Sequence, residues 1–336
     1  MGEEREIGID SARDFARAAL EAAGAGRAMA QSLAEATVAA ELRGRGSVGF
    51  AHLVDYIDGL KAGRIDGAAE PVSGSPAPAI VEVDARGGIA QHGFDLAFDT
   101  LCGRAFELGV ASLALRNSFT TGELGHYAIR LAERGLLALA ATNGPPLMAP
   151  PGVTRSVYCT NPLAFAAPGV DGPALLIDQA SSATAFVNLR EAASRGAPIP
   201  EGWAVDGQGA PTTDPAAALT GHLLPFGGVR GANVALMVEI LAAALTGANW
   251  SLDAPSFVTG DHSPGIGLFV LAIAPRGHAA DLATRLGAHL ERLAGLGVHV
   301  PGKGKRDGRS PGVATLRLRT EVLARIAEAS GIEPPR

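Results

Sequence analysis

The sequence predicts an α/β fold with a helical subdomain at its N-terminus. The chain has 336 residues, 47% of them hydrophobic, so it can bury a large core in one or two domains. Beyond residue 80, short apolar runs alternate with segments of helical periodicity, which is typical of α/β domains. Before residue 67, the apolar residues recur at helical spacing. A Pro- and Gly-rich stretch between the two parts has the composition of a linker.

The N-terminal part is expected to form three helices. Asp10 or Ser11 can cap the first helix, and glycines at 24 and 26 end it. The second helix covers 27–43, and the third carries His52 and ends at residue 63. The expected linker, GAAEPVSGSPAPA, follows at 67–79.

The remainder of the chain is expected to alternate between strands and helices. The expected strands cover 80–83, 110–115, 136–141, 163–167, 174–177, 267–273 and 314–318. The expected helices cover 92–108, 123–134, 186–195, 232–245, 279–296 and 321–329. Turns are expected to dominate 196–228, where glycine and proline recur.

Charge and composition exclude several kinds of partner. The net charge is -6, aromatic residues make up 5% of the chain, and no basic stripe is present. Nucleic acids and anionic membrane surfaces are therefore not expected partners. The longest apolar stretch, 234–248, has 15 residues and carries Glu239, so it is too short to span a membrane. The N-terminus is acidic where a signal peptide would be basic, which predicts a cytoplasmic location.

Cysteines and histidines argue against a metal site. Cys102 and Cys159 are the only cysteines, a number that suits a reducing compartment and excludes a disulfide scaffold. The eight histidines never form an i, i+4 pair. No metal is therefore expected.

The segment 142–168, TNGPPLMAPPGVTRSVYCTNPLAFAAP, is the most informative part of the chain. It joins two apolar runs, and its prolines fix φ and remove backbone donors, so it is expected to hold one shape. Long irregular loops between buried strands commonly carry function. The alternative is a structural crossover that binds nothing.

Other motifs are open to two readings. Residues 44–49, GRGSVG, match the letters of a dinucleotide-binding glycine motif, but a helix-forming run precedes them where that motif needs a strand. A helix-to-helix connection explains these glycines better. Asp178 follows an expected strand and either binds a ligand or caps a turn. Arg230 begins an expected helix and either meets a phosphate or is a surface residue, whereas Lys303 and Lys305 are expected to be solvated.

Taken together, these segments resemble the type-2 malate/L-lactate dehydrogenases, a family that includes sulfolactate and ureidoglycolate dehydrogenases and cyclic-ketimine reductases. The motifs that carry the resemblance are ELRGRGS, TNGPPLMAP, TNPLAFAAP, IDQASS, IPEGWAVDGQGAPTTDP, LLPFGGVRG and EILAAALTGA. The resemblance implies NAD or NADP as cofactor, a small-molecule substrate and a homodimer. It also implies a mixed-sheet dinucleotide-binding domain that is not a standard Rossmann fold. The implied division is a helical subdomain at 1–75, joined by the tail 305–336, and a cofactor-binding α/β domain at 76–304.

The resemblance also assigns residues to the cofactor site. Carried over by position, the contacts and the lining of the pocket fall on Gly144, Thr160, Asn161, Asp178, Gln179, Ala180, Arg230, Gly302, Lys303 and Gly304. At position 230 the family usually has Lys, and Arg keeps the charge while changing its geometry.

The expected catalytic positions differ from the family pattern. After Ser47 the family has an acid–base histidine, and this chain has Val48. The family arginine that pairs with a substrate carboxylate is matched by His52, and a second family histidine is matched by Thr120. Valine transfers no proton, and imidazole is a poorer carboxylate clamp than guanidinium. Three changes in one pocket predict an altered substrate.

The favoured hypothesis is an NAD(P)-dependent oxidoreductase for a small carbonyl, hydroxy or imine substrate other than the usual 2-oxo or 2-hydroxy acids. His52, Thr120 or Tyr158 would replace the lost acid. An imine suits such a site because it can arrive already protonated. Two alternatives stay open: a non-redox enzyme on the same scaffold, and a binding or regulatory protein without catalysis.

Overall fold

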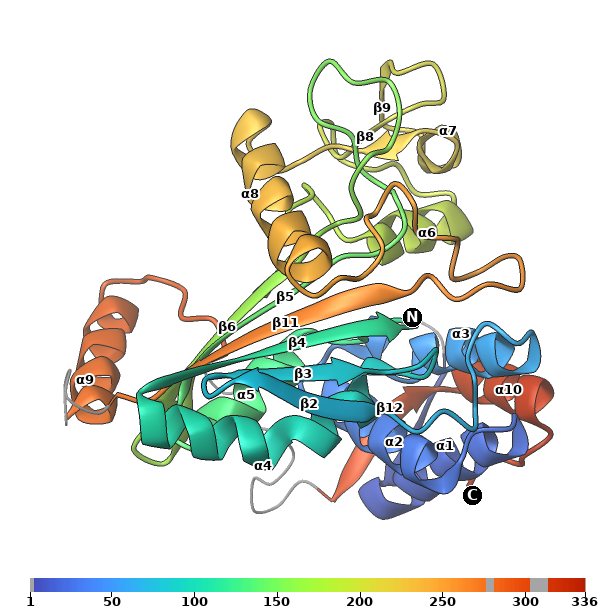
Figure 1. Ribbon diagram of the computed structural model, residues 1–336. Helices are drawn as coiled ribbons and strands as arrows, with labels where there is room; N and C mark the ends of the chain where they lie inside the picture. Colours follow the sequence, from blue (N-terminus) through green and yellow to red (C-terminus); the bar gives the residue numbers. More distant parts are fainter. Residues whose placement is uncertain (1–2, 276–280, 303–313, 336) are drawn as a thin grey trace.

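A seven-stranded mixed sheet forms the centre of the molecule (Figure 1). The computed structural model describes residues 3–275, 281–302 and 314–335. In spatial order the sheet contains β2 (Val72–Ala77), β3 (Ile80–Asp84), β4 (Val110–Ser118), β11 (Ile266–Ile273), β5 (Leu137–Thr142), β6 (Leu163–Gly169) and β7 (Gly172–Gln179). Strands β3 and β4 are parallel, and all other neighbours in this sheet are antiparallel.

Two helices cover one face of this sheet. They are α4 (Ala90–Leu108) and α5 (Gly125–Glu133). Alternate strand residues such as Val83, Leu113 and Val270 point to this face and are fully buried with both helices. Burial of this layer is the main hydrophobic contribution of the α/β part.

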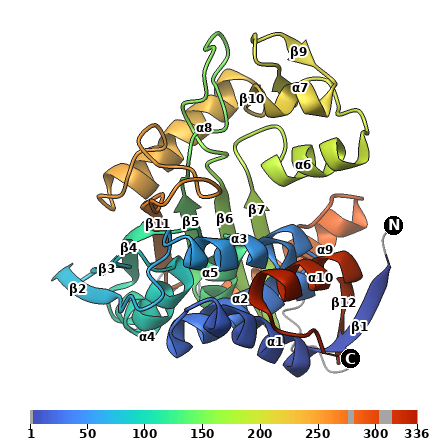
Figure 2. The same ribbon diagram turned by 90° about the vertical axis from the view of Figure 1, so that its right-hand side faces the viewer.

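The N-terminal helices and the C-terminal tail pack together below the sheet. Helices α1 (Ile9–Ala22), α2 (Arg27–Leu42), α3 (Phe50–Lys61) and α10 (Thr320–Ser330) share a separate core. Strand β1 (Glu4–Gly8) pairs antiparallel with β12 (Thr315–Arg319). The first and last strands of the chain therefore lie side by side, as Figure 2 shows.

A smaller layer, here named the upper lobe, lies above the sheet (Figure 2). It contains α6 (Phe186–Arg195), α7 (Pro215–Leu219), α8 (Val229–Glu239) and the three short strands β8 (Ala204–Val205), β9 (Pro211–Thr212) and β10 (His222–Leu223). The loop between β5 and β6 is here named the Pro-rich loop. The core of the upper lobe includes Met148 of this loop, together with Leu189 and Leu223. A π-helical turn, η2 (Ile240–Ala244), continues α8, and α9 (Leu282–Gly295) contacts the far end of β6.

Most of the predicted elements are confirmed, and the α/β class with it. The linker prediction is wrong for 72–77, because these residues form the edge strand β2. Strand β1 was not predicted, and the predicted turn region 196–228 contains β8, β9, α7 and β10. The segment 44–49 joins α2 to α3 through a short 3-10 turn, η1 (Gly46–Val48), so the helix-to-helix interpretation is confirmed. None of the described helices is long and apolar enough to cross a membrane.

Candidate active site at the carboxyl edge of the sheet

Four strands end along one edge of the sheet. The pairing pattern makes β3, β4, β5 and β7 run in one direction, so their last residues lie along the same edge. Strands β6 and β11 begin at this carboxyl edge. Ligands of open α/β sheets commonly bind outside the carboxyl ends of the strands. Of the predicted site residues, Thr120, Gly144, Asp178 and the pair at 160–161 all lie next to this edge.

The Pro-rich loop forms a wall at the carboxyl edge. Thr142 Oγ1 donates to the Gly267 carbonyl at 2.7 Å, and the Gly267 amide donates to Asn143 Oδ1 at 3.1 Å. Gly144 packs on Cys159, since a Cβ added at Gly144 would lie 2.9 Å from Cys159 Sγ. These contacts pack the beginning of the loop against β11 and against Cys159 near its end, and the stiffness expected from its prolines stays a prediction.

Buried hydrogen bonds hold the far end of this wall. Asn161 is fully buried, and its amide donates to Glu239 Oε2 at 2.8 Å and to the Ala235 carbonyl at 2.9 Å. Glu239 also accepts from Ser251, through its amide at 2.6 Å and its hydroxyl at 2.8 Å. The Ser181 amide donates to the Thr160 carbonyl at 2.8 Å, which ties this wall to the end of β7. Asn161 is thus a structural anchor, whereas the half-buried Thr160 remains on the site side of the network.

Asp178 lies against the first turn of α5. The Gly125 amide donates to Asp178 Oδ2 at 2.9 Å, so this carboxylate caps the start of α5 and not a turn of its own segment. Burial raises the pKa of Asp178 to about 6, against the lowering effect of the Gly125 bond and with a further rise from Glu123. Gln179 is exposed and Ala180 is half-buried at the same strand end. A carboxyl that titrates near neutrality at a strand end is typical of a functional site.

A buried ion pair joins α2 to the segment before α5. Arg43 Nε lies 2.9 and 3.0 Å from the two carboxylate oxygens of Glu123, and both side chains are 2% exposed. Arg45 reaches the Asp178 carbonyl with Nη2 at 3.4 Å. These contacts bring the 43–48 segment to the carboxyl edge.

His52, Asp55 and Thr120 form a hydrogen-bonded chain. His52 Nδ1 lies 2.7 Å from Asp55 Oδ2, and His52 Nε2 lies 3.2 Å from Thr120 Oγ1. His52 and Asp55 share one face of α3, and Thr120 follows the carboxyl end of β4. The structure thus brings two predicted catalytic residues into direct contact and adds a carboxylate to them.

The other predicted catalytic positions carry no such contact. Val48 is half-buried on η1 and Ser47 is exposed beside it. Tyr158 pairs through its backbone with Met148 and packs in the upper lobe, and no hydrogen bond of the described residues joins it to His52 or Thr120. Burial raises the pKa of its phenol, which disfavours ionisation there.

The start of α8 fits a phosphate group of a dinucleotide. Gly228 precedes the helix, and no side chain caps its first turn, so backbone N–H groups remain available. Arg230 is exposed in that turn and has no acidic partner among the described residues. Gly302, another predicted cofactor contact, packs on β7. A Cβ added there would lie 2.7 Å from the Leu176 amide nitrogen. Lys303 and Gly304 lie outside the described residues.

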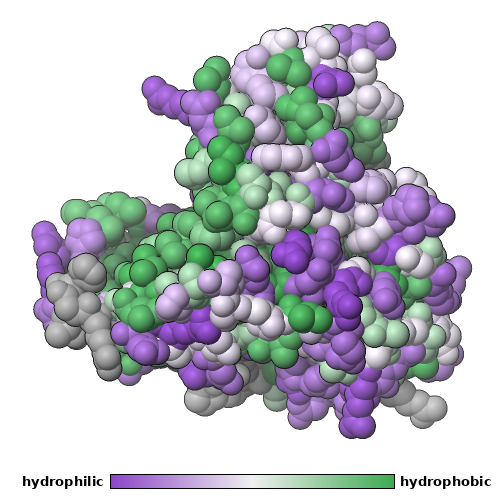
Figure 3. All heavy atoms as spheres, viewed as in Figure 1, coloured by the Kyte–Doolittle hydropathy of each residue, from purple (hydrophilic) through white to green (hydrophobic). Residues whose placement is uncertain are grey.

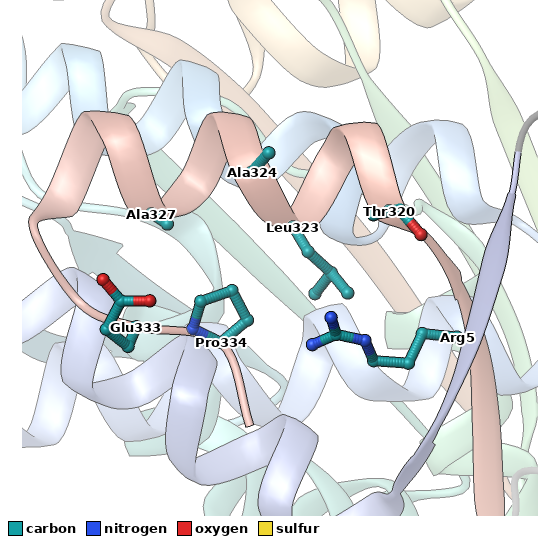
Figure 4. Close-up of a pocket in the computed structure, with 7 residues that line it drawn as sticks. All are labelled: Arg5, Thr320, Leu323, Ala324, Ala327, Glu333 and Pro334. Carbon is teal, nitrogen blue, oxygen red and sulfur yellow. The ribbon is translucent and has the colours of Figure 1, made fainter. Parts of the chain in front are cut away.

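A separate hollow of about 710 Å³ opens on the surface alongside α10 (Figure 4). Arg5, Thr320, Leu323, Ala324, Ala327, Glu333 and Pro334 line it. None of the predicted site residues is among them. It is therefore distinct from the carboxyl edge.

Comparison with known proteins places the chain in a family. The family model for malate/L-lactate dehydrogenase matches residues 7–323. The chain belongs to this family. A (2R)-3-sulfolactate dehydrogenase (NADP(+)) of Chromohalobacter salexigens is 38% identical over 95% of this chain and 96% of its own length. A Δ1-pyrroline-2-carboxylate/Δ1-piperideine-2-carboxylate reductase of Pseudomonas putida is 37% identical over 83% of each chain.

A solved structure gives the same result. The Δ1-piperideine-2-carboxylate reductase of Pseudomonas syringae pv. tomato superposes with a TM-score of 0.90, at 34% identity, over 97% of this chain and 99% of that chain. The resemblance to the type-2 malate/L-lactate dehydrogenases and its mixed-sheet fold are therefore confirmed. So is the predicted class of enzyme, an oxidoreductase that uses NAD or NADP.

Several residues of the site escaped prediction. Asp55 lies three residues after His52, a spacing that places both on one helix face, but Thr120, the other partner of His52, is distant in sequence. The Arg43–Glu123 pair gives no sequence signal, because its members are 80 residues apart. Glu239 did leave a signal, since it interrupts an apolar run.

Proposed function

We propose that this protein is an NAD(P)H-dependent reductase of a small cyclic imine that carries a carboxylate. The observation that carries the proposal is the His52–Thr120 hydrogen bond at the carboxyl edge, beside Val48. The site offers a threonine hydroxyl hydrogen-bonded to His52, whereas the family resemblance leads one to expect an acid–base histidine at position 48. An imine makes the smallest demand on such a site, because it is more basic than a carbonyl and can bind protonated.

The relatives support this substrate class. The P. putida relative and the P. syringae structure are both named as reductases of cyclic imine carboxylates. The exposed Arg190 of α6 brings positive charge close enough to Asp55 of α3 to help lower the pKa of that carboxyl. That charge favours an anionic substrate. The C. salexigens relative supports a second candidate, the oxidation of a small 2-hydroxy acid.

The proposed mechanism divides the work between cofactor and protein. A bound reduced nicotinamide supplies the hydride. Arg230 and the first turn of α8 hold a phosphate of the dinucleotide, and Gly144, Thr160 and the strand end at Asp178 line its pocket. Thr120 presents a hydroxyl that would pass a proton to the substrate nitrogen as its oxygen takes one from His52.

Binding and turnover test the proposal directly. NADH and NADPH are titrated into the protein while nicotinamide fluorescence is followed. The complex then receives Δ1-pyrroline-2-carboxylate, Δ1-piperideine-2-carboxylate and a set of 2-oxo acids, and oxidation is followed at the nicotinamide absorbance band. We expect turnover of the imines at least about tenfold faster than of the 2-oxo acids, a difference of about 1.4 kcal/mol in the barrier. Turnover of 2-oxo acids alone would overturn the imine proposal, and binding of neither cofactor would overturn the whole assignment.

A Val48→His variant sharpens this test. If the carboxyl edge has kept the family's geometry, the new imidazole should raise 2-oxo acid reduction by about 10²-fold, the range of general acid catalysis. A variant that gains nothing would show that more than one group separates the two chemistries. The parent protein is the matched control.

We also propose that the protein is a homodimer through the exposed side of α8. Leu236, Met237, Ile240 and Leu245 are between 45% and 59% exposed there. Figure 3 shows hydrophobic residues gathered along this side and over the sheet below it. Patches of this kind commonly mark an interface. Sedimentation at micromolar concentration measures the mass of the particle, and a monomer would contradict the proposal.

Two further expectations stay predictions. They are the division of the chain at 1–75, 76–304 and 305–336, and the cytoplasmic location.

A further inference from the structure

We propose that Asp55 is a positioning residue that acts through His52 on the hydroxyl of Thr120. The three side chains then form a proton relay that ends at the carboxyl edge of the sheet. This inference deepens the proposed function and rests on it for the identity of the proton acceptor. The contact between Asp55 and His52 can be tested without any substrate.

The distances fix what each atom of the relay does. An ionised carboxylate only accepts hydrogen bonds, so the 2.7 Å contact places a proton on His52 Nδ1. In the neutral ring, Nε2 is then bare and accepts from Thr120 Oγ1 at 3.2 Å. In the protonated ring, Nε2 donates to the same oxygen. Asp55 thereby fixes the tautomer, and Thr120 Oγ1 stays on the line of proton transfer in both states.

Neighbouring groups hold both ends of the relay in place. The His52 ring meets the Tyr56 ring edge-on at 4.9 Å and the Phe257 ring at 6.1 Å, between centroids. The Tyr56 hydroxyl donates to the Thr120 carbonyl at 3.2 Å. Gln91 donates to the Tyr56 hydroxyl at 3.1 Å and to the Thr121 carbonyl at 3.0 Å. Neither the imidazole nor the backbone of Thr120 is therefore free to drift.

The charges around the relay keep Asp55 ionised. Burial opposes its ionisation, but the hydrogen bond and charge of His52, with Arg190 of α6 and Arg325 of α10, hold the pKa of Asp55 below its usual value. Burial raises the pKa of Tyr56 to about 12, so this phenol remains a neutral donor. The side chains of His52 and Asp55 are 15% and 18% exposed, so water can reach the imidazole.

The proton count closes in each turnover. When the imine binds unprotonated, the Thr120 hydroxyl gives its proton to the substrate nitrogen before the hydride arrives, while its oxygen takes the proton of His52 Nε2. The imidazolium becomes neutral, and Asp55 keeps its charge and takes no proton. Solvent then returns one proton to the ring. Asp55 stabilises the charged form of the ring, which a threonine alone could not do.

Imidazole NMR tests the first half of the relay. Asp55→Asn removes the charge and keeps the shape, and Asp58→Asn removes an exposed carboxylate from the same helix as a matched control. We expect the neutral His52 ring to carry its proton on Nδ1 in the parent and in Asp58→Asn, and to populate both tautomers in Asp55→Asn, because the new amide donates as well as accepts. A His52 ring that keeps its proton wholly on Nδ1 in Asp55→Asn would overturn the proposal.

Kinetics of the imine reaction test the second half. Asp55→Asn should lower kcat by about 10- to 100-fold and move the alkaline limb of the pH profile to lower pH, with the KM for NADPH unchanged. Thr120→Val should lower kcat by at least as much, and Thr120→Ser should restore it to within about threefold. A Thr120→Val variant with full kcat would overturn the relay. If the parent reduces no imine, the proposed function fails by itself, while the NMR result still decides the role of Asp55.

Discussion

Two carboxylates on opposite sides of the carboxyl edge serve different ends. Glu239 is 4% exposed and accepts three hydrogen bonds, from the Ser251 amide, the Ser251 hydroxyl and the Asn161 amide. Asp55 is 18% exposed at its side chain and accepts from one imidazole. Glu239 faces amide and hydroxyl donors that do not ionise at ordinary pH, whereas Asp55 faces an imidazole that can take up and release a proton.

The two carboxylates differ in role: one holds the backbone in place, and the other helps to transfer a proton. A buried carboxylate that is saturated with protein donors fixes the backbone around it, because each lost bond leaves a buried group unsatisfied. A carboxylate that is mostly buried but still reached by water, and that has a titratable partner, can act on a proton that water renews. The same side-chain chemistry therefore builds the wall of the site on one side and its proton supply on the other.

The largest expected effect comes from Glu239→Gln. The amide must turn its NH₂ group toward one of the donors, so at least one buried hydrogen bond to a charged group is lost and a repulsive contact replaces it. We expect the free energy of unfolding to fall by about 3 kcal/mol, as measured by urea denaturation. The shape of the pH profile for activity should not change, in contrast to Asp55→Asn.

An exposed glutamate provides the control for this experiment. Glu201→Gln lies on the surface of the upper lobe and should leave the unfolding midpoint within about 0.5 kcal/mol of the parent. A Glu239→Gln protein of parental stability but altered pH profile would reverse the comparison, making Glu239 the residue that moves protons.

The sequence located the edge of the site better than its chemistry. Asp178 was found because it follows an apolar run that predicts a strand, and strand ends are a local property. Thr120 and Gly144 came only from the family resemblance. Asp55 was missed because its meaning depends on Thr120, whose contact with His52 spans 68 residues. A contact between residues so far apart in the chain produces no periodic pattern in the sequence.

The error at 67–79 has a different physical cause. Strand β2 is an edge strand that is almost wholly exposed, so it lacks the apolar alternation that marks half-buried strands. Its pairing with β3 is irregular between Gly74 and Ala77, where Pro76 removes a backbone donor. Proline and serine in an exposed edge strand have the same composition as a linker.

Asp178 resembles Glu239 in accepting a hydrogen bond from the backbone, and it resembles Asp55 in lying where a proton can be exchanged. It gives the next prediction. Its pKa in the folded chain, about 6, lies above the ordinary value of 3.8, so the folded state holds this proton more tightly than the unfolded chain does. The stability gained in this way is full below about pH 4 and is lost as pH rises through about 6. Asp178→Asn should therefore be more stable than the parent at pH 8 by about 2 kcal/mol, with the difference vanishing near pH 4.

Urea denaturation at pH 4, 6 and 8 measures this difference. The asparagine oxygen can still accept from the Gly125 amide, so the cap of α5 is kept. Asp171→Asn, an exposed change in the turn that precedes β7, should show no such pH dependence. A constant difference between Asp178→Asn and the parent at all three pH values would show that the carboxyl is not strained by burial.

The smallest expected effect concerns the packing of the wall. In Gly144→Ala the new Cβ would lie 2.9 Å from Cys159 Sγ, so the loop must shift, and we expect a loss of about 1–2 kcal/mol in unfolding free energy. Cys159→Ala removes the sulfur, so the double variant should recover most of that loss beyond the cost of the cavity. Additive losses in the double variant would contradict the contact. Because Cys159 also donates its amide to Ser251, a shift at Gly144 is transmitted to Glu239, and cofactor affinity should fall in the single variant and return in the double one.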